Sequence, residues 1–90
     1  MWVAELRISD RTAAKIHAKH AITVNEVRDE IECVRGLRGS LDVHPEHGVR
    51  LILEFTLRGK PALAVLFDAK HPLGDVWNLG SVYFRQGGAS

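Results

Sequence analysis

A lysine and a histidine, Lys19 and His20, stand next to each other where one predicted helix ends and another begins. Histidine exchanges a proton near neutral pH, and a lysine ammonium group offers a point charge to a phosphate. Together the two side chains could move protons or hold phosphate in a transfer reaction. A second interpretation stays open, because His20 continues the apolar face of Ala13 and Ile16 and could be a packed, hydrogen-bonded core residue.

Three arginines are the second set of candidates for phosphate chemistry. Arg50 and Arg58 alternate onto the polar face of one predicted strand, and Arg85 lies in the last predicted strand. A guanidinium group can bind phosphate through two hydrogen bonds and stabilise the charge that develops during transfer. Alternation also places Trp77 and Tyr83 on the face of Arg85, where an aromatic ring could stack on a base. The alternative is that these side chains are solvent-facing groups on an exposed sheet.

Metal chemistry is not expected from this sequence. His17 and His20 are one helical turn apart, and His44 and His47 have a similar spacing across a predicted turn. A zinc site needs three or four ligands in a defined geometry. The single cysteine, Cys33, is predicted to lie within a helix, and no acidic residue completes a recognisable set. The chain also lacks a glycine-rich phosphate loop and a nucleophile elbow, so no cofactor is predicted.

The elements that must position these residues begin with a strong helix start. Thr23 and Glu26 have the spacing of a capping box, and Ile22 and Val27 have that of a hydrophobic staple. The apolar stripe that follows predicts a helix, which Gly36 is expected to end. This stripe consists of Val24, Val27, Ile31 and Val34.

The remaining pattern predicts an α+β fold. Residues 2–8 are expected to form a strand or extended arm, and residues 11–19 a helix capped by Ser9 or Asp10. After Gly39 the hydrophobic period changes to two. The later strands are predicted at 41–43, 49–58, 62–68 and 76–85. We therefore expect two N-terminal helices packed on one face of a small antiparallel sheet. Residues 1–86 would form one domain, followed by a flexible tail at 87–90.

Composition limits the classes of function. The chain has 90 residues, of which 46% are hydrophobic and 26% charged, and its formal net charge is +1. No apolar run approaches the roughly 20 residues of a membrane span, and the amino terminus lacks the pattern of a secretory signal. With a single cysteine, these features favour the cytoplasm. Nucleic-acid binders usually carry a larger basic excess, so such a role must depend on a local cluster.

The nine residues from Lys19 to Val27, together with Ser9 to Arg11 before the first helix, resemble the BrnT-type toxins. These are small ribonucleases of bacterial type II toxin–antitoxin systems with a RelE-like fold. Members often read lysine, histidine, glycine, valine or isoleucine, then serine or threonine, two further residues and an acid. Ala21 stands at the glycine position here, and the family's closing arginine-rich strand and terminal helix have no evident counterpart.

The resemblance implies a metal-independent endoribonuclease that acts on RNA and is inhibited by a small antitoxin protein. It implies catalytic roles for Lys19, His20, Arg50 and Arg58. Arg85 is matched to a late strand arginine of the family, and His17 and Tyr83 are the further candidates for substrate binding. The alternative is a non-catalytic binding or dimerisation module on the same scaffold. Such a module could form a homodimer through an exposed sheet edge or bind a partner peptide.

Overall fold

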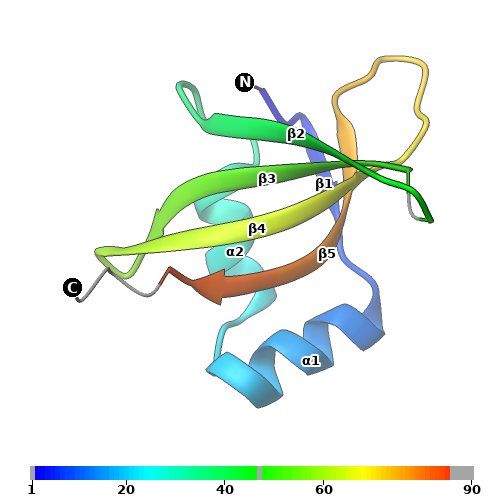
Figure 1. The fold of residues 1–90 in the computed structure, drawn as a ribbon. Coiled ribbons are helices and arrows are strands. Elements are labelled where there is room, and N and C mark those ends of the chain that lie inside the picture. The colour runs from blue at the N-terminus through cyan, green and yellow to red at the C-terminus, as the bar shows by residue number, and fades with distance from the viewer. Residues whose placement is uncertain (1, 47, 86–90) are drawn as a thin grey trace.

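Five strands form one mixed sheet in the order β1-β5-β4-β3-β2, and two helices connect β1 to β2 (Figure 1). The computed structural model describes residues 2–46 and 48–85, so His47 and the tail expected at 87–90 lie outside the described residues. The strands are β1 (Glu5–Arg7), β2 (Arg38–His44), β3 (Gly48–Leu57), β4 (Lys60–Asp68) and β5 (Val76–Phe84). The helices are α1 (Asp10–His20) and α2 (Val24–Ile31). Neither of these described helices is long and apolar enough to cross a membrane.

The prediction of an antiparallel sheet is wrong at one edge, because β1 runs parallel to β5, with Glu5 opposite Val76. The other three strand pairs are antiparallel, as predicted. Side chains near the end of α2 hold the outer side of β1. The Glu32 carboxylate accepts a hydrogen bond from the Leu6 N–H at 2.8 Å, and Arg28 donates to the Leu6 carbonyl at 3.3 Å. This three-residue strand is therefore held on both sides, through contacts that hydrophobic alternation cannot predict.

The start of α2 confirms the predicted capping box. The Thr23 hydroxyl accepts the Glu26 N–H, and the Glu26 carboxylate accepts the Thr23 N–H at 3.2 Å. The predicted end of the helix at Gly36 is wrong, because α2 ends at Ile31. The Cys33 N–H donates to the Val3 carbonyl at 2.8 Å, so the backbone after the helix bonds to the N-terminal segment instead of continuing the helix.

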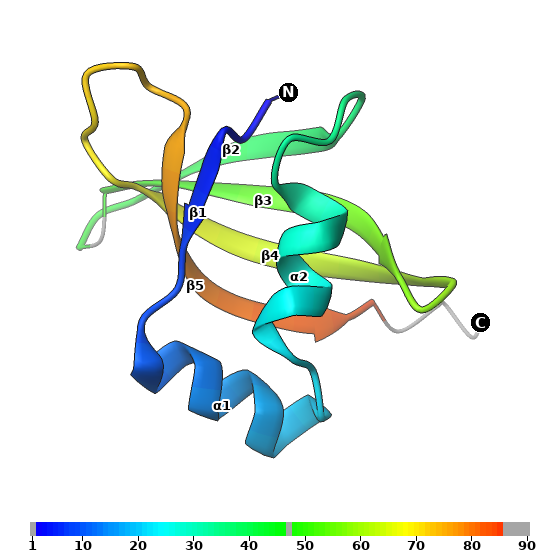
Figure 2. The same cartoon turned by 180° about the vertical axis from the view of Figure 1, so that it is seen from behind.

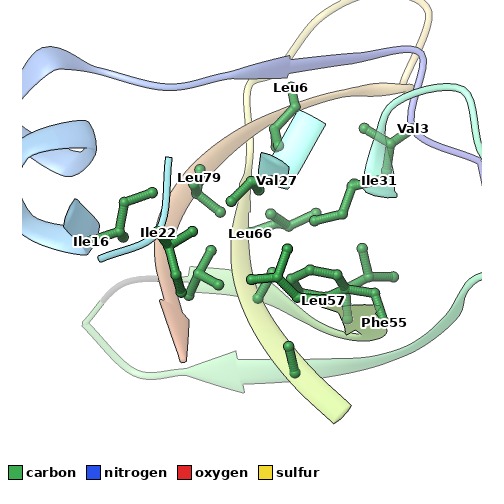
Figure 3. Packing of buried hydrophobic residues seen from close by; sticks show 14 of the residues in the cluster. Val3, Leu6, Ile16, Ile22, Val27, Ile31, Phe55, Leu57, Leu66 and Leu79 are labelled. Atoms are coloured by element: carbon green, nitrogen blue, oxygen red, sulfur yellow. The ribbon is translucent and has the colours of Figure 1, made fainter. Parts of the chain in front are cut away.

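The core lies between α2 and the sheet, and α1 packs on β5. Figure 3 shows Val27 and Ile31 of α2 beside the inward-facing side chains of the strands. Ile16 is the one residue of α1 that is fully buried. In Figure 2, α2 crosses the sheet while α1 lies alongside β5. This arrangement differs from the expected pair of helices over one face, because α1 has a single apolar anchor.

A β-bulge in β5 corrects the expected common face of Trp77 and Tyr83. Ser81 pairs with Val65 and Leu79 pairs with Leu66, so Gly80 is the extra residue. An extra residue reverses the alternation of side chains along a strand. Trp77 therefore packs against the core, whereas Tyr83 lies on the opposite face and is exposed.

Replacing Ala21 by glycine is expected to stabilise the fold by about 0.5–1 kcal/mol. Ala21 ends α1 in the left-handed conformation, with φ 54°. The left-handed conformation costs a residue with a Cβ roughly 1–2 kcal/mol, and glycine avoids this cost. Glycine also makes the unfolded chain more flexible, which destabilises the folded state by about 0.4–1 kcal/mol and so cancels part of the gain in stability. Urea denaturation of the variant measures the change.

The matched control is Ala18→Gly, at an exposed position inside the same helix. It is expected to destabilise the fold by about 1 kcal/mol, because glycine is a poor helix former. An equal loss of stability in both variants would contradict the explanation for Ala21.

Candidate functional site

A small hollow of about 160 Å³ between α1 and β5 brings together several of the predicted site residues. Lys19 and His20 reach it from α1, and Tyr83 reaches it from β5. Lys15 and Ser81 also line it, over the buried side chains of Ile16 and Val82. None of these lining residues is acidic. The hollow therefore combines two ammonium groups, an imidazole and two hydroxyls.

Helical spacing explains why the basic side chains share this hollow. Lys15 and Lys19 are four residues apart, as are the buried Ile16 and the half-buried His20, so both pairs face β5. The Lys15 ammonium group also donates to the Gly80 carbonyl at 3.4 Å, across the gap to the bulge. The end of α1 exposes carbonyl groups and is the negative end of the helix dipole. The positive charge of the hollow thus comes from its side chains.

Arg58 reaches the helix junction but is engaged there by an acid. Its guanidinium donates from Nε to one oxygen of Glu26 at 2.5 Å and from Nη2 to the other oxygen at 2.6 Å. The same Nη2 donates to the carbonyl of Ala21 at 2.8 Å, one residue beyond His20. The hydrogen bonds from Arg58 and from the Thr23 N–H lower the pKa of Glu26 from 4.5 to about 2. Arg58 therefore joins the β3–β4 turn to both helices.

The other two predicted arginines lie elsewhere and also have carboxylate partners. Arg50 pairs with Asp42 of β2 at 2.6 Å, and Arg85 pairs with Glu54 of β3 at 3.1 Å. Arg50 and Leu57 are seven positions apart along β3, which corresponds to roughly 23 Å, and Arg58 lies beyond Leu57 in the β3–β4 turn rather than on the predicted strand. The structure therefore does not bring Arg50 together with Arg58 around one phosphate.

His17 does not line the hollow. Its side chain is exposed on α1, and its carbonyl accepts the N–H of Ala21 at 2.9 Å. Sequence reasoning missed Lys15, although its spacing of four residues from Lys19 was a usable signal. It also missed Ser81, whose orientation depends on the bulge. Within residues 2–46 and 48–85, no three His, Cys, Asp or Glu side chains are placed so that they could hold a metal ion.

Comparison with family models, with curated proteins and with solved structures finds no match to this chain. The residues of the hollow and their geometry are therefore the features of this chain that indicate a function.

Proposed function

We propose that this protein is a toxin-like, metal-independent endoribonuclease on a RelE/BrnT-like scaffold, with its site in the hollow between α1 and β5. The supporting observation is that Lys15, Lys19, His20 and Tyr83 line one hollow without an acidic neighbour. An RNA phosphate is an anion that two ammonium groups can hold. His20 adds an imidazole, a side chain that commonly serves as a general acid or base.

The proposed reaction needs only groups of the hollow and of the RNA. The 2′-hydroxyl attacks the adjacent phosphorus, and the bond from phosphorus to the 5′-oxygen breaks. Neutral His20 takes the proton of the 2′-hydroxyl, and the Lys19 ammonium donates a proton to the departing 5′-oxygen. Lys15 stabilises the negative charge on the phosphorane. The products are a 2′,3′-cyclic phosphate and a 5′-hydroxyl end.

Tyr83 and Arg58 have supporting roles in this proposal. The Tyr83 ring can stack on a base beside the cleaved bond. Arg58 fixes the helix junction through Glu26 and the Ala21 carbonyl, and so positions His20 without touching the RNA. The proposed inhibitor is a small antitoxin that covers the hollow in the cytoplasm.

Induced expression in a bacterial host tests the activity, with growth and total-RNA integrity as the readouts. The native chain is expected to arrest growth and cleave RNA. The double variant Lys19→Ala/His20→Ala is expected to lower the cleavage rate by about 10²-fold or more, which is the usual contribution of acid–base groups. The matched control is His17→Ala, on the same helix but outside the hollow. Intact RNA with abundant folded native protein would exclude the activity, and equal loss in the control would exclude this site.

A second candidate function is RNA binding without cleavage, by a module on the same scaffold. The carboxylate partners of Arg50 and Arg58 favour it over cleavage, because the family resemblance gives these two arginines catalytic roles and each is paired with an acid. Purified protein would then retain RNA and leave it intact. Binding should weaken as the salt concentration is raised. In Lys15→Ala/Lys19→Ala binding should be weaker and its dependence on salt shallower, since each lost phosphate contact lowers the salt slope.

A further inference from the structure

The strand β2 forms an edge of the sheet (Figure 1), and its apolar side chains are exposed. Leu41 is 69% exposed and Val43 is 73% exposed, and Val49 beside them on β3 is 46% exposed. These three side chains share one face, because Leu41 pairs with Leu51 and Val43 pairs with Val49. The strand contains neither proline nor lysine, the residues that commonly protect an edge.

We propose that β2 pairs antiparallel with β2 of a second copy of this chain, around a twofold axis at Ser40. The outward N–H and C=O groups of this edge face no strand among the described residues. Antiparallel pairing with an identical strand would satisfy them and join two sheets into one of ten strands. The inference does not depend on the proposed ribonuclease activity.

Charge complementarity selects the second copy and its register. A twofold axis at Ser40 places Arg38 of each copy opposite Asp42 of the other, and symmetry makes two such pairs. Arg38 has no ion pair with any residue that the structure describes. Asp42 bonds Arg50 and has about half of its side chain exposed, so it can accept a second guanidinium. An opposed pair of this kind is favourable across two strands.

The same register also covers the exposed apolar side chains. Leu41 would lie opposite Gly39 of the second copy, where the absence of a side chain leaves room. Val43 would lie opposite Leu37 of the second copy, which packs against its own core. Both contacts remove apolar area from water, as a stable interface requires.

A twofold axis at Leu41, one residue further along β2, would give a less favourable pairing than the axis at Ser40. Centred on Leu41, the register places Arg38 opposite His44 and Asp42 opposite Ser40, so both arginine–aspartate pairs are lost. The hollow between α1 and β5 lies toward the opposite edge of the sheet. The proposed dimer would therefore leave both hollows accessible.

Charge-swapped variants test the partner and the register together. The mass of the native chain, measured by light scattering after size-exclusion chromatography, is expected to be that of two 10.0 kDa chains. Arg38→Glu and Asp42→Lys should each dissociate to monomers, because each places like charges opposite one another twice. Mixing the two variants should restore a dimer, because both cross-strand pairs then have opposite charges. Val43→Lys should also be monomeric, since it buries a charge.

Far-UV circular dichroism and thermal unfolding of each variant show whether the fold is retained. We expect the fold to be retained, because the substituted side chains are wholly or partly exposed. A native chain that stays monomeric at all concentrations would overturn the proposal, even if it bound an unrelated extended peptide at β2. A dimer that survives both charge variants would also overturn it. RNA binding and cleavage by monomeric variants should match the native values, so failure of the dimer is distinguishable from failure of the proposed function.

Discussion

Truncating Ile16 to alanine is expected to lower the free energy of unfolding by about 2–5 kcal/mol, the usual cost of removing a buried isoleucine side chain. Ile16 is 1% exposed and is the one fully buried residue of α1. Its loss leaves α1 with no fully buried apolar anchor on β5. The expected loss is a large fraction of the 5–15 kcal/mol typical of small domains. Urea denaturation measures it.

The same substitution should weaken the proposed RNA binding, because Ile16 forms part of the floor beneath Lys15 and His20. Ile16→Val is the graded control and should cost only about 0.5–1.5 kcal/mol. Leu73→Ala, at an exposed position in the β4–β5 loop, should leave the stability of the chain nearly unchanged. If Ile16→Ala unfolded no more readily than Leu73→Ala, α1 would have to be held mainly by contacts other than this side chain.

Features that depend on neighbouring residues in the chain were predictable. The capping box of Thr23 and Glu26 requires three residues of separation, and the alternation along β3 requires two. Both patterns follow from local geometry alone. The central place of β4 also followed, because its two faces are apolar.

Features set by distant segments were not predictable. The end of α2 depends on a hydrogen bond from Cys33 to Val3, and the direction of β1 depends on contacts of Leu6 with α2. The bulge at Gly80 depends on the ring of Phe67, which packs where a Cβ at position 80 would lie. In each case the partner is more than ten residues away, so hydrophobic period carries no information about it.

In the candidate site too, features set by nearby residues were predictable and features set by distant residues were not. Lys19 and His20 were found because a helix places them together, whereas the alternation that singled out Tyr83 placed it on the wrong face, which the bulge at Gly80 corrects. The acidic partners of the arginines were not, since Glu26 and Arg58 are 32 residues apart in the chain. Strand alternation therefore showed where the arginines lie but not that acidic residues pair with them.

Acidification is expected to destabilise this protein partly through Glu26, whose pKa is lowered from 4.5 to about 2. The hydrogen bonds from Arg58 and Thr23 favour the ionised carboxylate in the folded chain. The folded state thus binds fewer protons than the unfolded state between these two values, so stability rises with pH across this window. The contribution is complete above about pH 4.5 and disappears as the pH falls toward 2.

Glu26→Gln isolates this contribution, because glutamine can keep the hydrogen bond to the Thr23 N–H while removing the charge. Unfolding midpoints of the native chain and of the variant should differ most at pH 7 and should converge as the pH is lowered from 4.5 toward 2. Glu30→Gln is the matched control, an exposed position on the same helix, and should follow the native curve. A gap between native and Glu26→Gln that stayed constant down to pH 2 would mean that the ion pair with Arg58 does not hold the helix junction. The position of His20 would then have to depend on contacts that do not need this charge, namely the packing of Ile16 and Ile22 and the hydrogen bond from Arg58 to the Ala21 carbonyl.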